Sequence, residues 1–182
     1  DGSCMEIKRN ADWTIDDVQF ENCKGYGLYL NSAGATRAYN GDIGGNGATG
    51  SVSGMLITGD CAAGGANGNE ITIQGFHFKG NYKHDIELDG NNGGSYCSIG
   101  HNITGNTFNG SSNTTSNTAD AINVSNSAYN VISNNQIYAD TTGRAYRYGI
   151  AFFSTTLTEL SDAVNGNSIQ AVTTGTAGIL RV

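Results

Sequence analysis

The sequence contains no proline, few charged residues and no long apolar run. Charged residues make up 14% of its 182 residues, whereas disordered chains are usually rich in Pro, Glu and Lys. No apolar stretch reaches the roughly 20 residues that a membrane-spanning helix needs. The composition therefore predicts a folded chain rather than a disordered or membrane-spanning one.

Positive charge is also scarce. The chain has 9 Lys and Arg residues against 16 Asp and Glu residues, which gives a net charge of −7. A protein that binds a nucleic-acid backbone needs a basic face, so this class of function is disfavoured. The same imbalance disfavours a strongly anionic ligand, although a local patch of charge can override the net value.

The four cysteines show no CxxC spacing, so a zinc site has little support. They are Cys4, Cys23, Cys61 and Cys97. They are consistent with small buried apolar side chains or with disulfides, which an even count permits but does not show. The redox compartment therefore stays open at the level of the sequence.

Glycine is abundant, with 27 residues, and Asn is frequent as well. Both tolerate a positive φ, so they favour tight turns between short strands. One motif recurs six times: an apolar residue, any residue, a turn residue, two more residues and another apolar residue. Its third position predicts a bend in the left-handed region between two strands. These third positions are Asp17, Asn40, Gly75, Gly105, Asn134 and Gly166.

A second motif alternates with the first along the chain. It is a short strand of alternating apolar residues, found at 5–9, 27–31, 54–58, 85–89, 121–125 and 149–153. The pair of motifs recurs every roughly 23 to 36 residues, which is typical of the coils of a solenoid. Two inward rows of side chains are expected to stack from coil to coil: Met5, Leu28, Met55, Ile86, Ile122 and Ile150, and Ile7, Leu30, Ile57, Leu88, Val124 and Phe152.

With both motifs, the chain resembles the right-handed parallel β-helix proteins of the pectate-lyase-like superfamily. The sequence ISNNQI followed by GIAFF is similar to that family's Asn turn and first-sheet strand, and residues 13–30 are similar to coils of phage tailspikes. The resemblance implies an all-β, right-handed parallel β-helix of about six coils, each with three short strands. The chain begins at Asp1, without Met or a signal peptide, and both ends stop in mid-coil. We therefore expect residues 1–182 to be a single domain that is part of a longer chain.

The family includes polysaccharide lyases, hydrolases, epimerases and tailspikes that bind or cut bacterial surface glycans. This chain departs from the polygalacturonase-like pattern, because it has IDD in the turn motif, GHN at 100–102 and no RIK. No Arg occupies an assignable outward position on the first sheet, where pectate lyases carry their base. The resemblance is therefore specific for the fold and weak for the reaction.

The stretch HDIELDG places an acid at every second position. In the register of the repeat, Ile86 and Leu88 point inward, so Asp85, Glu87 and Asp89 are expected to point outward from the first sheet. In this family, that sheet and its flanking loops form the glycan groove. The acids are therefore expected to lie where a sugar chain would bind.

Paired carboxylates suit the acid–base cleavage of a glycosidic bond. Close like charges raise the pKa of one member, as a general acid requires, and Glu87 is the expected acid. Asp85 and Asp89 flank it, and Asp120 on the next coil is expected as a partner. Two other interpretations stand beside this one: a calcium site, since calcium prefers several carboxylate and carbonyl oxygens, and a solvated acidic face.

A further set of side chains is expected to contact the glycan: Tyr29, Asn31, Asn123, Lys83, His84 and Arg147. The first three lie in outward rows of the first sheet, where rings and amides suit sugar recognition. Lys83 and His84 are expected at the groove edge as counter-charges for the acids. Arg147 is expected to grip a sugar or a carboxylate, or to be an ordinary surface residue. Trp13 is expected in the core.

These observations predict a domain that binds and cleaves a bacterial surface or matrix polysaccharide by Asp/Glu acid–base hydrolysis, without a cofactor unless calcium is bound. A lyase reaction is less favoured. The alternatives are a non-catalytic glycan-binding adhesin and a structural β-helix of a fibre. The resemblance implies an extracellular or virion-surface location and a homotrimer or larger fibre. The acidic charge predicts no nucleic-acid partner, and the lack of a long apolar run predicts no membrane insertion.

Overall fold

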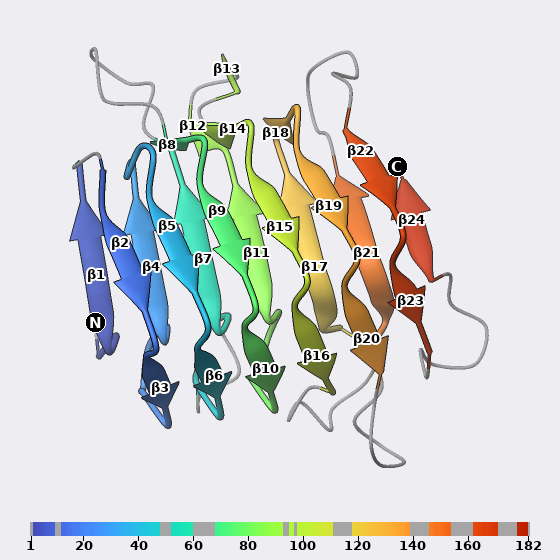
Figure 1. The fold of residues 1–182 in the computed structure, drawn as a ribbon, viewed down its shortest axis with the longest axis horizontal. Coiled ribbons are helices and arrows are strands. Elements are labelled where there is room, and N and C mark those ends of the chain that lie inside the picture. The colour runs from blue at the N-terminus through green and yellow to red at the C-terminus, as the bar shows by residue number, and fades with distance from the viewer. Residues whose placement is uncertain are drawn as a thin grey trace.

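The computed structural model describes residues 2–9, 12–47, 52–59, 68–92, 95–96, 98–110, 118–138, 146–153, 162–170 and 178–181. Their strands form three long parallel sheets that run along a common axis (Figure 1). The colour passes steadily from blue to red along this axis, so successive coils stack in chain order and the two termini lie at opposite ends.

Six coils each contribute one strand to each long sheet, and the first sheet has β24 as a seventh strand. The first sheet contains β1 (Met5–Lys8), β4 (Leu28–Asn31), β7 (Met55–Thr58), β11 (Ile86–Asp89), β17 (Asp120–Ser125), β21 (Tyr148–Phe153) and β24 (Ile179–Arg181). The second contains β2 (Thr14–Asp16), β5 (Arg37–Tyr39), β9 (Thr72–Gln74), β15 (Asn102–Thr104), β19 (Val131–Ser133) and β22 (Ala163–Asn165). The third contains β3 (Gln19–Glu21), β6 (Asp42–Gly44), β10 (His77–Lys79), β16 (Thr107–Asn109), β20 (Gln136–Tyr138) and β23 (Ser168–Ile169).

Two smaller groups of strands accompany the long sheets. The strands β8 (Gly68–Asn69), β14 (Ser98–Ile99) and β18 (Ser127–Ala128) pair in parallel. The strands β12 (Asn91–Asn92) and β13 (Ser95–Tyr96) form an antiparallel pair. Successive strands of each long sheet are parallel and are joined through strands of the other two sheets. Since such crossovers are right-handed, the predicted right-handed parallel β-helix is confirmed. Within the described residues, no helix is long and apolar enough to span a lipid bilayer.

The core lies between the three sheets, and its first-sheet side has the predicted register. Both inward rows pair from strand to strand in the order expected from the sequence. Most of their members are fully buried, while Met5 and Phe152 at the two ends are partly buried. On the third sheet, Phe78 and Phe108 stack with ring centroids 4.9 Å apart. The core is therefore built by repetition, with each coil covering the next.

The bend between the second and third sheets also follows the prediction. All six third positions of the turn motif have positive φ, between 50° and 71°. Immediately after the bend, a buried Asn connects neighbouring coils. Asn135 Oδ1 accepts from the amide of Asn106 at 2.9 Å, and its Nδ2 donates to the carbonyl of Ile103 at 3.0 Å. The side-chain amides thus satisfy backbone groups that the corner leaves without ladder partners.

The histidine of GHN is part of another such corner. His101 is fully buried, its Nδ1 accepts from the amide of Ile71 at 3.3 Å, and its Nε2 lies 2.6 Å from Ser98 Oγ. Burial lowers the pKa of His101 to about 3, so the ring is neutral. Since Nδ1 accepts, Nε2 carries the proton and donates to Ser98. This histidine is a structural group.

A disulfide closes the first coil. Cys4, just before β1, is bonded to Cys23, just after β3, with Cα atoms 5.7 Å apart. Cys61 and Cys97 lie outside the described residues. The expectation that Trp13 belongs to the core is wrong, because its side chain is 42% exposed. It precedes β2, the end strand of the second sheet, which has a neighbouring strand on one side only.

Candidate functional site

The outward side chains of the first sheet align from coil to coil as the sequence predicts. One row contains Tyr29, Leu56, Glu87, Asn123 and Ala151. The next contains Asn31, Thr58, Asp89, Ser125 and Phe153. We call these two rows, together with Tyr26, Lys83 and Arg147 beside them, the outer face.

Glu87 lies in the middle of the outer face, and its carboxylate is held from two sides. Ser53 Oγ donates to Oε2 at 2.6 Å, and Lys83 Nζ lies 2.6 Å from Oε1. Burial alone would raise the pKa of Glu87, but the charge of Lys83 and the hydrogen bonds from Lys83 and Ser53 lower it overall. Glu87 is therefore ionised at neutral pH, and the predicted raised pKa of a proton-donating acid is wrong.

Asp120, at the start of β17, is fully buried and clamped by Arg147. Arg147 Nε donates to Oδ1 at 3.0 Å and Nη2 donates to Oδ2 at 2.7 Å. Asn123 Nδ2 adds a third hydrogen bond, to Oδ2 at 2.8 Å. The guanidinium carbon lies 5.0 Å from the ring centroid of Tyr148 and 5.6 Å from that of Phe153. The hydrogen bond to Asp120 raises the pKa of Arg147, so the guanidinium keeps its charge near neutral pH.

His84 is buried and belongs to the same cluster. Its Nδ1 accepts from the amide of Asp120 at 3.0 Å, so the proton of the neutral ring is on Nε2. Burial lowers the pKa of His84, and the 3.5 Å approach of Nδ1 to Asp120 Oδ2 is therefore not an ion pair at neutral pH. The prediction of a counter-charge at the groove edge is wrong for His84, whereas Lys83 does pair with Glu87.

Asp85 is buried rather than outward-facing, contrary to the prediction from strand alternation. It precedes β11, at the corner where the chain turns from the third sheet into the first. Asn81 Nδ2 donates to Oδ1 at 2.7 Å, and the hydroxyl of Tyr146 donates to Oδ2. Burial raises the pKa of Asp85 to about 7, against the lowering effect of these two hydrogen bonds. Asp85 is thus 1% exposed and lies out of reach of a ligand on the outer face.

The corner that holds Asp85 is lined by amides. Asn46 Nδ2 donates to Asn81 Oδ1 at 3.1 Å, and Asn81 Nδ2 donates onward to the carbonyl of Ile43 at 3.0 Å. Gly54 lies against this row, and a Cβ there would stand 2.6 Å from the Asn81 side chain. The absence of a side chain at Gly54 therefore lets the amide row pack directly beneath the first sheet.

The remaining predicted residues form a polar strip across the outer face. Thr58 Oγ1 donates to Asn31 Oδ1 at 3.4 Å on one side, and Ser125 Oγ donates to Asn123 Oδ1 at 3.2 Å on the other. Asp89 lies between Thr58 and Ser125 in the strand register and is half-buried. Asn123 itself is 6% exposed, so it orients Asp120 and offers little surface of its own.

Two tyrosines lie at the N-terminal side of this strip. The rings of Tyr26 and Tyr29 are 5.3 Å apart at an interplanar angle of 41°, and both are half-buried. Burial, followed by the charge of Glu87, raises the pKa of Tyr26 to about 12, so its hydroxyl stays protonated. The sequence pointed to Tyr29 but missed Tyr26, because Tyr26 precedes the strand and strand alternation does not place it.

The described residues give no support to a calcium site. No group of three or more His, Cys, Asp or Glu side chains among them is placed to hold a metal ion. Glu87 and Asp120, which were expected as an acid–base pair, are each neutralised by a cation. The arrangement can therefore present hydrogen-bonding groups and rings to a ligand, but it holds its two central carboxylates in ion pairs.

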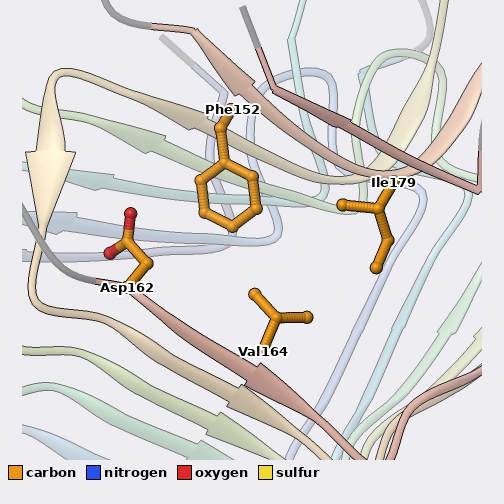
Figure 2. A pocket seen from close by; sticks show the side chains of 4 residues that line it. All are labelled: Phe152, Asp162, Val164 and Ile179. Atoms are coloured by element: carbon orange, nitrogen blue, oxygen red, sulfur yellow. The ribbon is translucent and has the colours of Figure 1, made fainter. Parts of the chain in front are cut away.

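A pocket of about 260 Å³ lies at the C-terminal end of the stack and is lined by Phe152, Asp162, Val164 and Ile179 (Figure 2). Val164 pairs with the core residue Ile132, and Ile179 pairs with Ile150. The pocket therefore adjoins the core and is not part of the outer face.

No family model and no curated protein matches this sequence. The solved structures that are similar to it include the following two. One is the alginate lyase from Paenibacillus sp. strain FPU-7, with a TM-score of 0.50 and 12% identity over 100% of this chain and 75% of that chain. The other is a surface protein and adhesin of Streptococcus pneumoniae, with a TM-score of 0.37 and 10% identity over 97% of this chain and 68% of that chain. At this identity, the first likeness supports the fold and not a shared reaction.

Proposed function

We propose that the chain binds a polysaccharide along its outer face. The observation that carries this proposal is the tyrosine pair, Tyr26 and Tyr29, beside a strip of amides and hydroxyls from adjacent coils. Sugar recognition combines flat apolar rings with hydrogen-bonding edges, and this face offers both. Adjacent strands are about 4.8 Å apart, so the strip from β4 to β21 is about 19 Å long, enough for several sugar units.

The similar alginate lyase is named for a polysaccharide, which agrees with a polysaccharide ligand here. This support is an analogy of fold and is weaker than the side-chain chemistry of the outer face. The Cys4–Cys23 disulfide supports a location outside the cytoplasm, since such bonds persist in oxidising compartments. We propose that the protein lies outside the cell or on a virion surface. There it would be assembled as a homotrimer or within a longer fibre, as in tailspikes.

Binding is favoured over cleavage because the central carboxylates are ion-paired. A hydrolase needs one protonated carboxyl within reach of the scissile bond, and an ionised Glu87 is unsuited to that role. Among the described residues, the carboxyl with a raised pKa is Asp85, which is buried. Cleavage remains the second candidate because perturbed titratable groups gather beside the face, as they do in active sites.

The first test is affinity electrophoresis against a panel of bacterial polysaccharides, with Tyr29→Ala as the binding variant. We expect Tyr29→Ala to weaken binding about fivefold or more, because a ring that covers a sugar face is lost. Tyr39→Ala is the matched control, because Tyr39 lies outward on β5 of the second sheet. Equal binding by both variants would place the ligand elsewhere.

Release of reducing ends from the same panel separates binding from cleavage. We expect no release by the wild-type protein. Release that disappears in Glu87→Gln would establish cleavage of the polysaccharide and restore Glu87 as the catalytic group.

A further inference from the structure

Both cations of the outer face are already committed to carboxylates. Lys83 Nζ lies 2.6 Å from Glu87 Oε1. Arg147 uses Nε and Nη2 on Asp120, and the rings of Tyr148 and Phe153 lie over its guanidinium. A carboxylate on a sugar would therefore meet cations whose charge an internal carboxylate already neutralises, which weakens the charge-assisted hydrogen bond that it could gain.

The charge balance of the outer face is not positive. Lys83 and Arg147 contribute two positive charges, while Glu87, Asp89 and the buried Asp120 contribute three negative ones, which leaves −1. Lys8 and Glu6 at the edge of the sheet pair with each other at 3.1 Å and cancel. A polymer with a negative charge on each sugar would meet a face that repels it, most strongly at low salt.

The chain as a whole is also acidic, with a net charge of −7. Neither the local nor the global charge thus favours an acidic ligand.

We infer that the polysaccharide bound on the outer face is uncharged, a neutral hydroxyl-rich glycan rather than a uronate polymer. This inference rests on the proposed function. The groups left for recognition are the rings of Tyr26 and Tyr29 and the hydroxyls and amides of Asn31, Thr58 and Ser125, which exchange neutral hydrogen bonds with sugar hydroxyls.

The experiment is affinity electrophoresis against several neutral polysaccharides and several uronate polymers, each uronate beside its carboxyl-reduced derivative. Reduction removes the charge and keeps the backbone linkage. We expect binding to a neutral member, with an affinity that changes less than about twofold between about 50 and 500 mM salt. We expect no uronate polymer to bind more tightly than its reduced derivative.

Two variants that remove one negative charge each test whether the charge of the outer face disfavours uronate polymers. Glu87→Gln releases Lys83 from its partner and should raise the affinity for a uronate polymer by about threefold to tenfold. Asp42→Asn makes the same change in net charge on the third sheet, where Asp42 contacts His77. This control variant should change the affinity for the uronate polymer less than about twofold. Thermal melts of both variants exclude a fold defect as the cause.

Three results would overturn the inference. Tighter, salt-sensitive binding to a uronate than to its reduced form would leave polysaccharide binding intact and refute the neutral ligand. An unchanged uronate affinity in Glu87→Gln would refute the role of the Lys83 pair. Failure to bind any member of the panel would refute the proposed function itself.

Discussion

Asp85 is a carboxyl group whose charge depends on burial. Its pKa is about 7 in the folded chain, against an ordinary value of 3.8 that applies when the chain unfolds. Between about pH 4 and pH 7, the folded state therefore keeps a proton that the unfolded state has lost. This residue contributes stability that is fully present below about pH 4 and is lost as the pH rises through about 7.

Asp85→Asn should remove this pH dependence while keeping the shape of the side chain. The wild type should lose stability as the pH rises from about 4 to 8, and the variant should not. We therefore expect the free energy of unfolding of the variant minus that of the wild type to increase by up to several kcal/mol over this range. Urea unfolding at a series of pH values measures the difference. A constant difference across this range would mean that Asp85 is ionised throughout.

The Arg147 clamp gives a second prediction at the residue scale. Arg147→Ala leaves the buried carboxylate of Asp120 without its cation, which should lower the free energy of unfolding by about 3 kcal/mol. Arg37→Ala is the control, because Arg37 is exposed on β5 and should cost less than about 0.5 kcal/mol. Similar losses in both variants, measured by urea unfolding, would contradict a stabilising clamp.

The individual contacts of the site could be predicted only in part from the sequence. Glu87 and Asp85 are two residues apart, yet one is on the outer face and the other is buried. Strand alternation holds inside β11 and fails at the corner before it. The partners of Asp85 include Tyr146, which is 61 residues away in the sequence. No local sequence pattern predicts a contact between residues so far apart.

At the scale of the element, the bends were predictable because their cause is local. A positive φ favours Gly, Asn or Asp, and the motif carries one of these at every bend. The strands were predictable for the same reason, since alternation is a property of neighbouring residues. The exposure of Trp13 was not, because it depends on which strand ends the second sheet.

Alanine substitutions at two bend glycines with similar φ, Gly105 and Gly75, can separate the cost of a strained backbone from the cost of a crowded Cβ. A Cβ at Gly105 would meet nothing within 4 Å, whereas one at Gly75 would stand 2.8 Å from Asn40 Oδ1. Gly105→Ala should cost about 1 kcal/mol for the left-handed backbone alone, and Gly75→Ala should cost about 2 kcal/mol or more. Thermal unfolding of the two variants provides the comparison, and an equal loss would show that the Asn40 side chain moves aside freely.

At the scale of the whole molecule, the disulfide secures one end of a stack whose coils depend on their neighbours. Replacing Cys4 and Cys23 together by Ser opens a loop with a sequence separation of 19 residues. We expect the free energy of unfolding to fall by about 3 kcal/mol, mainly because the unfolded chain gains freedom. Urea unfolding of the double variant, compared with wild type under non-reducing conditions, tests this, and an unchanged midpoint would contradict it.

The hydrogen bond between Tyr146 and Asp85 has a consequence for how the stack comes apart. In a solenoid whose coils contact only their neighbours, amide protons exchange progressively from the ends inward. Tyr146 precedes the sixth coil and Asp85 precedes the fourth, so this bond reaches past the coil between them. Opening the middle of the molecule then requires these coils to separate together. Native-state hydrogen exchange should therefore find β11, β17 and β21 in one cooperative unit, which Tyr146→Phe divides into two.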